Sequence, residues 1–313
     1  VSPMWGTSLH WLRGPMLTRG GGSPVKVVLS PNPYRDRGLK AALKAREILK
    51  SGGVDTSLCL PFDLEQGSGH AELPRDLDYR NMQDELERAD ILLCFGGDGT
   101  ILHAARDANA HNVPILGVNM GSVGFMAELE HSELDMLSQL SKRKYTIEPR
   151  MMLDVSVRRG RETLYRDLAL NDAVITKGAV ARVIDLIVRG DGVHIYDYSG
   201  DGVILATPTG STAYSMSAGG PIVEPTSENI LVTPICAHSL HAKPLVMGRD
   251  RIVSVRIGKL SRKTAYLSVD GGRAFKLCGG DTVEVRRSKS VTRLVRLTDH
   301  SFYEIINQKL GRA

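Results

Sequence analysis

The hydrophobic residues of the first half of the chain fall into short runs, separated by longer stretches in which apolar and polar positions alternate at helical spacing. Four apolar runs predict buried strands: Val25–Leu29, Val54–Leu60, Asp90–Phe95 and Ile115–Val118. The stretch Gly38–Ser51 has an apolar side typical of a helix, as do the residues that follow Thr100. Strands that alternate with helices predict an open, mostly parallel sheet.

From about Met151 the pattern changes to alternation with a period of two residues. Val183–Val188 and Val193–Tyr196 flank an Asp-Gly pair, which predicts a hairpin with a tight turn. Val253, Val255 and Ile257 alternate with polar residues, as do several later pairs. The second half is therefore predicted to be β-rich and sandwich-like. The last residues, Phe302–Leu310, have the pattern of a short helix.

The chain has 313 residues, which is more than one typical domain holds. We expect an α/β N-terminal domain at residues 25–150 and a β-rich C-terminal domain at 151–298. A C-terminal segment at 299–313 would pack back on the first domain. Residues 1–24 read as a flexible leader, because Arg13 and Arg19 interrupt the apolar runs that a signal peptide requires.

Composition narrows the class of protein. Charged residues make up 24% of the chain and hydrophobic residues 42%, values typical of a globular protein with a buried core. The four cysteines are far apart in the sequence and form no CxxC pair, which favours the reducing cytoplasm. We expect no membrane span, because no window holds about 18 consecutive apolar residues. We also expect no metal site at Cys236, His238 and His241, since no fourth ligand lies nearby in the sequence.

Net charge is +5, and much of the excess lies in one region. Between Arg249 and Arg296 the chain carries 13 Lys or Arg and four Asp or Glu. A basic region of this kind could contact nucleic acid, but it is more often the solvated side of a sheet. We therefore expect no nucleic-acid partner.

The first candidate for chemistry is the turn Gly96-Gly97-Asp98-Gly99-Thr100, between a predicted strand and a predicted helix. Glycines let the backbone approach a ligand closely, and the start of a helix points free N–H groups at an anion. Asp98 adds a carboxylate that could accept a proton from a hydroxyl nucleophile or help to hold Mg²⁺. The alternative is a purely structural turn in which Asp98 caps the helix. The chain contains neither a GxxxxGK[ST] loop nor a GxGxxG fingerprint, so it matches neither P-loop kinases nor dehydrogenases.

A second candidate is the segment from Gly200 to Pro221. Between Thr207 and Ser217 it holds six hydroxyl residues, together with Gly210 and Tyr214. Hydroxyl groups, backbone N–H groups and one aromatic ring can hold a sugar, a base and phosphates. The segment has no GxSxG elbow, so it does not favour a serine hydrolase.

With two further motifs, Asn119-x-Gly121-x-x-Gly124-Phe125 and Asn171-Asp172, the chain resembles the NAD kinases from Val25 to near its C-terminus. The glycine-aspartate turn alone also occurs in phosphofructokinases and in lipid kinases, so Thr207–Pro221 carries most of the resemblance. The resemblance implies a dinucleotide site between the two domains. The implied reaction moves the terminal phosphate of ATP to the 2′-hydroxyl of the adenosine ribose of NAD. It uses Mg²⁺ or another divalent cation, and in some members polyphosphate is the donor.

The resemblance also implies roles for single residues. Asp98 would accept the proton of the ribose hydroxyl, and Gly99 would lie beside the bound NAD. Asp172 stands where many relatives have Glu, and its shorter side chain would reach the ligand through a water. Ser199 stands where some relatives have Arg, which leaves the choice between NAD and NADH open. The remaining positions implied to contact the nucleotides are His103, Asn171, Arg182, Asp201, Thr209, Thr212, Ala213, Tyr214, Ser215, Met216, Ser217 and Gly272. A homo-oligomer, either a dimer or a tetramer, is expected by analogy.

Two rival interpretations remain at this point. One is a lipid or sugar-phosphate kinase of the same superfamily, which would need a different second half. The other is a non-catalytic dinucleotide sensor whose basic region contacts nucleic acid.

Overall fold

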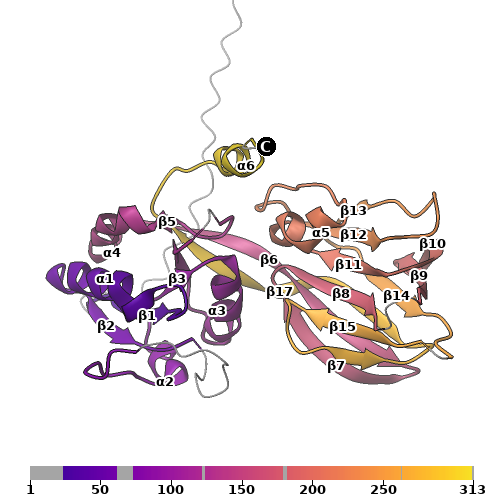
Figure 1. Cartoon of the computed structure of the whole chain (residues 1–313), viewed down its shortest axis with the longest axis horizontal. Coiled ribbons are helices and arrows are strands. Elements are labelled where there is room, and N and C mark those ends of the chain that lie inside the picture. Colours follow the sequence, from indigo (N-terminus) through magenta and orange to yellow (C-terminus); the bar gives the residue numbers. More distant parts are fainter. Residues whose placement is uncertain (1–23, 62–72, 122–123, 179–181, 262, 312–313) are drawn as a thin grey trace, which may run out of the picture.

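A computed structural model describes residues 24–61, 73–121, 124–178, 182–261 and 263–311. It has two lobes side by side (Figure 1). The predicted leader, residues 1–24, lies outside the described residues except for Pro24. Within the described part, no helix is long and apolar enough to cross a membrane.

The first lobe is built on five parallel strands. They are β1 (Lys26–Pro31), β2 (Asp55–Leu58), β3 (Ile91–Gly96), β4 (Ile115–Asn119) and β5 (Leu129–Glu130). Alternate side chains of each strand point to opposite faces, so Val27 packs into one apolar cluster and Val28 into another. Both faces of the sheet are therefore buried, as the uninterrupted apolar runs of the sequence predict.

Helices cover both faces of this sheet (Figure 1). Helix α1 (Lys40–Ser51), with α4 (Ser138–Ser141) and the 3₁₀ turns η1 (Arg37–Leu39) and η3 (His131–Leu137), covers one face. Helices α2 (Met82–Leu86) and α3 (Asp98–His111) cover the other. The turn η3 begins with a capping box formed by Glu130 and Glu133, whose side chains accept the free backbone N–H groups at its start.

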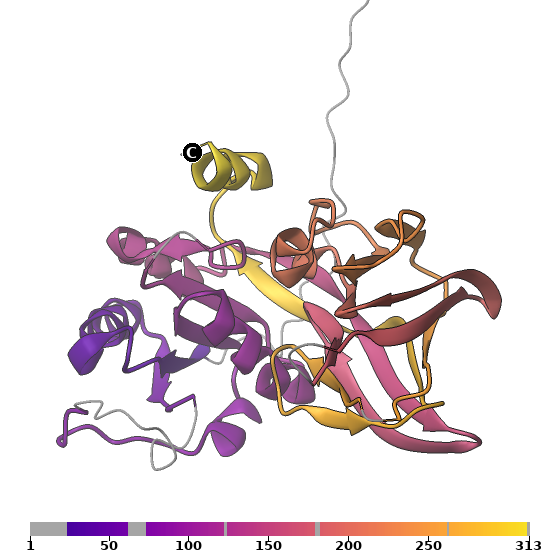
Figure 2. The ribbon, with the colours of Figure 1, turned by 45° about the vertical axis from the view of Figure 1, so that its right-hand side comes forward.

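The second lobe packs two β-sheets face to face (Figure 2). One is a six-stranded antiparallel sheet in the order β13-β12-β11-β8-β15-β16. Its strands are β8 (Asp172–Lys177), β11 (Gly202–Ala206), β12 (Asn229–Ile235), β13 (Leu245–Gly248), β15 (Ala265–Val269) and β16 (Phe275–Leu277). Against it lie β6 (Thr146–Arg159), β7 (Glu162–Ala169), β9 (Ile184–Gly190), β10 (Val193–Gly200), β14 (Val253–Ile257) and β17 (Thr282–Arg296). The apolar side chains of both sheets form one core between them. The α/β lobe and this β-rich lobe agree with the predicted fold class.

The predicted hairpin is present as β9 and β10. Asp191 and Gly192 both have positive φ angles, 50° and 81°. Two consecutive residues with positive φ give the turn whose twist matches that of the flanking strands, and Asp-Gly is a preferred pair for it. This explains why the turn could be read from the sequence.

The two longest strands run through both lobes. β6 pairs with β17 over nearly its whole length, and β17 also reaches β4 of the parallel sheet. Met151 packs in the core of the β-rich lobe, whereas Met152 packs under α3 in the α/β lobe. The expected boundary at residues 150 and 151 therefore falls inside a continuous strand, so the lobes are joined by sheet at this point.

The last helix, α6 (Phe302–Leu310), has the predicted bounds and lies above the junction of the lobes (Figure 1). Its Phe302 ring lies 6.2 Å from that of Phe125 in the α/β lobe. Lys309 places its ammonium 4.0 Å above the same ring. A hydrogen bond of 3.4 Å from the Tyr303 hydroxyl to Glu224 reaches the other lobe. The helix therefore contacts both lobes through a few side chains.

Candidate functional site

The glycine turn leads from β3 into α3, as the sequence predicts. Gly97 is the N-cap of α3 and Asp98 is its first residue. The half-buried Asp98 carboxylate does not cap its own helix; it accepts N–H bonds of 2.9 Å from Phe125 and 3.0 Å from Met126. A Cβ at Gly124 would lie 2.4 Å from this carboxylate, so glycine is needed there for the loop to approach. The Asn-Gly-Gly-Phe motif and the glycine turn therefore form one structure around Asp98.

A cavity of about 320 Å³ opens beside this turn. Gly97, Gly99, Thr100 and His103 line it from the start of α3. The other lining residues come from the ends of neighbouring strands: Asn32, Arg35, Pro61, Asn119, Met120 and Gly121. Arg35 and His103 are exposed, and the free N–H groups of α3 begin here. Because a helix N-terminus and two basic side chains attract negative charge, the cavity suits a phosphate chain.

Asn171 and Asp172 lie at the start of β8 in the other lobe, beside Asp270. The Asp270 carboxylate accepts the N–H groups of Leu170, Asn171 and Asp172 at 2.7, 2.8 and 3.0 Å. Asp270 itself has a positive φ of 50°, which a residue with a side chain adopts only when its surroundings hold it. The side-chain oxygen of Asn171 is a buried acceptor that lacks a hydrogen-bond partner in the described structure. It is therefore free to accept from a bound ligand.

The Asp172 side chain is an unusual acid. Burial and the negative charge of Asp270 raise its pKa to about 7. Burial also raises the pKa of Asp270, although the three N–H groups oppose that change. Two carboxylates thus share one buried place, where loss of the second proton is disfavoured.

The hydroxyl-rich segment is held in place by buried hydrogen bonds to neighbouring parts of the β-rich lobe. The buried Thr207 hydroxyl donates to the Leu170 carbonyl at 2.5 Å, and the Thr207 N–H donates to that of Asn171. Ser215 is fully buried and shares a hydrogen bond of 2.8 Å with Thr233 of β12. Ser215 therefore fixes the segment rather than facing a ligand. Thr209 and Thr212 lie in the turn η4 (Thr209–Thr212), and Tyr214, Met216 and Ser217 belong to α5 (Tyr214–Ser217), with Ala213 between them.

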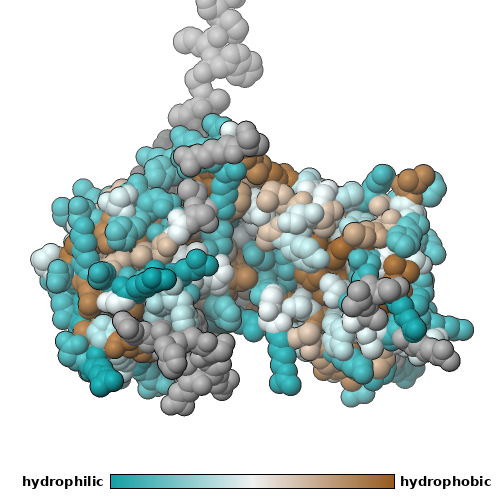
Figure 3. Space-filling model, viewed as in Figure 1, coloured by the Kyte–Doolittle hydropathy of each residue, from teal (hydrophilic) through white to brown (hydrophobic). Residues whose placement is uncertain are grey.

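The two lobes approach each other along α3. Arg106 of α3 forms an ion pair of 3.1 Å with Asp167 of β7. A Cβ at Gly272 would lie 3.1 Å from the Arg106 guanidinium. Gly272 and the Asn171–Asp172 pair therefore lie along the flank of the helix that begins at Asp98. The space-filling view shows the surface hollowed between the lobes (Figure 3).

Three predicted residues lie apart from this group. Asp201 stands at the start of β11 and Thr207 follows its end, so about 20 Å of extended strand separates them. Asp201 forms an ion pair of 2.6 Å with Lys177, and Ser199 donates to Asp185 at 2.5 Å. Arg182 is exposed and lies just before β9. The chain by itself does not bring these three to the Asp98 site.

Sequence reasoning missed three residues of the site, of which Arg150 is the most deeply buried. Arg150 on β6 is 2% exposed, and its guanidinium donates to the Thr209 hydroxyl at 3.2 Å. Its charge also interacts with that of Asp98. The only sequence signal was a charged residue directly before the apolar Met151-Met152 pair. Asn32 and Arg35 of the cavity were also missed, because the loop after β1 reads as an ordinary turn.

Six of the described basic side chains between Arg249 and Arg296 form ion pairs: Arg249, Arg251, Lys263, Arg286, Arg287 and Arg296. Arg249 and Arg287 both contact Glu228, and Arg251 contacts Asp191 at 2.9 Å. These pairs neutralise about half of the positive charges of the region, and the absence of a nucleic-acid partner stays a prediction.

Comparison with known proteins agrees with both halves of the site. Residues 46–145 match the family model of the ATP-NAD kinase N-terminal domain, and residues 170–297 match that of the C-terminal domain. The NAD kinase of Natranaerobius thermophilus is 42% identical over 285 residues, which cover 91% of this chain and 97% of the relative. That of Symbiobacterium thermophilum is 44% identical over 223 residues, covering 71% and 78%.

Two solved structures are also similar. Yeast NADH kinase complexed with NADH superposes with a TM-score of 0.78 at 28% identity, covering 93% of this chain and 89% of that one. An NAD kinase from Archaeoglobus fulgidus in complex with ATP gives 0.68 at 25% identity, covering 92% and 99%. Neither rival, the lipid or sugar-phosphate kinase or the non-catalytic sensor, is favoured by these matches. The chain belongs to the NAD kinase family.

Proposed function

We propose that the cleft between the lobes binds NAD with the 2′-hydroxyl of its adenosine ribose at Asp98, and transfers the terminal phosphate of ATP to that hydroxyl to give NADP. The observation that carries this proposal is the position of the Asp98 carboxylate. It stands at the start of α3, beside a cavity suited to phosphates, and its charge interacts with Arg150, which contacts the hydroxyl-rich segment.

Asp98 can act as the proton acceptor in this arrangement. Each of its oxygens accepts one backbone N–H, and a carboxylate oxygen can accept a second bond. A ribose hydroxyl is a poor nucleophile at neutral pH, and a positioned base accelerates such a step by roughly 10²- to 10⁴-fold. The rest of the rate enhancement would come from orientation of the two substrates and from positive charge near the phosphoryl group.

The phosphates of the donor would occupy the cavity beside the glycine turn. Arg35, His103 and the N–H groups of α3 would face them. Among the described residues, no group of three or more acidic, histidine or cysteine side chains could hold a metal ion. A divalent cation such as Mg²⁺ would arrive with the phosphates, as Mg²⁺ commonly does, and Asp98 would offer it a carboxylate beside the cavity. When bound, the cation would neutralise charge on the phosphates. ATP and polyphosphate both fit this description.

The dinucleotide would be held by the β-rich lobe. The unpartnered oxygen of Asn171 suits an amino group, such as that of adenine. Tyr214 is 44% exposed and offers a ring on which a base can stack. Asp172, Thr209 and Gly272 would complete the contacts, together with Thr212, Ala213, Met216 and Ser217 on the same segment.

We further propose that the active protein is a homo-oligomer. Ser199 and Asp201 are matched to dinucleotide-binding positions but lie at the far end of β11, so they would serve a site shared with a second copy. Val193 on the edge strand β10 and Val246 on the edge strand β13 are 69% and 51% exposed, and Leu240 is 86% exposed. Exposed apolar groups on sheet edges are typical of surfaces that become buried on association.

A cytoplasmic location is part of the same proposal. All four cysteines are free, and Cys59 and Cys94 are buried as thiols. Free thiols fit a reducing compartment, where NAD and ATP are also available.

The test is an assay of NADP formation from NAD by the purified protein. ATP and polyphosphate are offered in turn, each with and without Mg²⁺. We expect NADP with at least one donor, and only when the divalent cation is present. Binding of NAD with no NADP under all of these conditions would contradict the proposal.

A further inference from the structure

Arg150 has a position that stability alone does not explain. Its side chain is 3% exposed and forms an ion pair of 2.6 Å with Glu148 on the same strand. Burial lowers the pKa of the guanidinium, while the Glu148 carboxylate opposes this change. A buried ion pair is often no more stabilising than apolar side chains of the same size. A charge kept in such a place therefore calls for another role.

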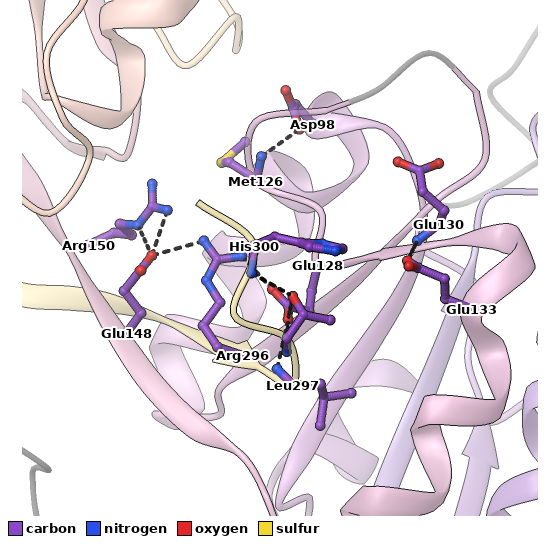
Figure 4. A network of polar contacts seen from close by, with 11 residues as sticks. Asp98, Met126, Glu128, Glu130, Glu133, Glu148, Arg150, Arg296, Leu297 and His300 are labelled. Atoms are coloured by element: carbon purple, nitrogen blue, oxygen red, sulfur yellow. Dashed lines mark hydrogen bonds and ion pairs between the residues drawn. The ribbon is translucent and has the colours of Figure 1, made fainter. Parts of the chain in front are cut away.

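Arg150 is the end of a chain of ion pairs that starts in the other lobe. Glu128 lies two residues after Met126, whose N–H holds Asp98. Glu128 pairs with Arg296 of β17 at 2.9 Å, and Arg296 pairs with Glu148 at 2.9 Å (Figure 4). These contacts fix the Arg150 guanidinium relative to the loop that holds Asp98. The hydrogen bond to Thr209 is the contact that extends from this network into the hydroxyl-rich segment.

The direction of that hydrogen bond determines what Thr209 can offer to a ligand. An arginine side chain can only donate, so the Thr209 oxygen must accept from Arg150. No described group takes the hydrogen of the Thr209 hydroxyl. Because one of its lone pairs is occupied, the hydroxyl is turned so that its O–H points elsewhere. The buried Thr209 is thereby prepared as a donor.

We propose that Arg150 is a positioning residue for NAD, which turns the Thr209 hydroxyl into a hydrogen-bond donor toward an acceptor oxygen or ring nitrogen of the dinucleotide. This inference rests on the proposed function, because it assumes that NAD occupies the Thr209 side of the cleft. In this role the ion pairs with Glu148, Arg296 and Glu128 hold the guanidinium at the angle that Thr209 requires. Arg150 does not touch the reacting atoms.

A double-mutant cycle tests the inference. The variants are Arg150→Lys, Thr209→Val and the combination, measured for kcat, for KM with NAD and with ATP, and for NAD affinity by calorimetry. Each single variant is expected to raise KM for NAD about tenfold, because it removes a hydrogen bond to a charged or ordered group. KM for ATP should change less than about twofold. If Arg150 acts through Thr209, the combination is no worse than Thr209→Val alone. Thr209→Ser keeps the hydroxyl and is expected to recover most of the NAD affinity that Thr209→Val loses.

A matched control is available on the same strand. Arg159, at the other end of β6, forms a bidentate pair with the fully buried Asp281, at 2.8 and 3.0 Å. Arg159→Lys is expected to lower the melting temperature to a similar extent and to leave KM for NAD unchanged. If Arg150→Lys does not fold, Glu148→Gln loosens the same guanidinium and takes its place in the cycle.

The outcomes separate the two proposals. If the unchanged protein binds NAD but makes no NADP, the proposed function fails, while NAD affinity still reports on Arg150. If NADP is formed and the effects of Arg150→Lys and Thr209→Val on KM for NAD are fully additive, or if Arg150→Lys changes stability only, the inference is overturned.

Discussion

The glycines that line the phosphate cavity and the glycines at the two ends of β11 differ in how closely they are packed. In the α/β lobe, a Cβ added at Gly97 or Gly99 would meet nothing within 4 Å. In the β-rich lobe, a Cβ at Gly210 would lie 2.1 Å from the Asn171 carbonyl oxygen, and one at Gly202 would lie 2.0 Å from that of Ile175. The turn that lines the phosphate cavity is the open half of the cleft, because its backbone is accessible to a ligand. The region around β11 is the packed half, because Gly202 and Gly210 lie against the backbone of neighbouring segments.

This difference suggests a division of work. A phosphate chain is flexible and carries charge on every unit, so it can be held by open N–H groups and a few cations. A base and a ribose are rigid and need donors and acceptors at fixed places, which packed segments hold better than open ones. Catalysis would depend on Asp98, where the two halves meet. Substitutions in the open half should therefore change turnover or donor binding, and those in the packed half should change stability or NAD binding.

The largest expected effect is that of Asp98→Asn. An amide cannot accept the ribose proton, so kcat is expected to fall by roughly 10²- to 10⁴-fold or more. NAD affinity, measured by calorimetry, should largely survive because the dinucleotide contacts lie in the other lobe. Near-normal turnover would exclude Asp98 as the base.

Asp36→Asn provides the matched control for this substitution. The buried Asp36 carboxylate accepts two backbone N–H groups, from Ala41 at 3.0 Å and from Ala42 at 2.9 Å, as Asp98 does from Phe125 and Met126. Both variants lose one such acceptor, so both should lose stability to a similar extent in thermal unfolding. A similar fall of kcat in both would mean that the effect of Asp98→Asn is structural.

Gly210→Ala tests the packed half. The added methyl group would meet the Asn171 backbone at 2.1 Å, and backbone cannot move aside as a flexible side chain can. Overpacking of this kind costs about 1–3 kcal/mol and occasionally more. Chemical denaturation should show this loss, together with weaker NAD binding, because the Asn171 backbone would shift. Unchanged stability would show that the segment is looser than its contacts indicate.

Asp172→Asn should change how stability depends on pH. The pKa of Asp172 is about 7 in the folded chain and about 4 in the unfolded chain, so the unfolded state releases its proton first as pH rises. Ionisation of Asp172 therefore lowers the free energy of unfolding progressively between about pH 4 and pH 7. Asparagine does not ionise, so the free energy of unfolding of the variant does not fall in this way.

The effect of Asp172→Asn can be followed by denaturant unfolding across that range. The variant should match the original protein near pH 4 and exceed it at pH 8, by on the order of 4 kcal/mol. Asp270→Asn should show the same sign, since the pKa of Asp270 is also raised. A difference between variant and original protein that is the same at every pH would contradict the raised pKa of Asp172.

Local signals explain which parts of this structure could be predicted. The strand before Gly96, the helix after Asp98 and the turn at Asp191-Gly192 follow from neighbouring residues, since apolar periodicity and glycine act over a few positions. The position of Arg150 could not be predicted in this way. Its hydrogen-bond partner Thr209 is far away in the sequence, and so is Arg296, which pairs with the neighbouring Glu148 because β17 lies beside β6. The separation of Asp201 from Thr207 could not be predicted either. The resemblance assigns residues to a binding site, but it does not show that these two lie at opposite ends of β11.

The smallest expected effect is that of Gly99→Ala, and it is the sharpest test of the open half. Gly99 is the second residue of α3, where alanine is a better helix former, so the variant should gain roughly 0.5 kcal/mol in stability. The same methyl group lies on the wall of the phosphate cavity and should raise KM for ATP severalfold, with KM for NAD nearly unchanged. If the variant is more stable but binds ATP more weakly, the absence of a side chain at Gly99 serves ligand binding and not folding. If donor binding were unchanged, Gly99 would be present for the turn alone, and phosphates would approach through Gly97 instead.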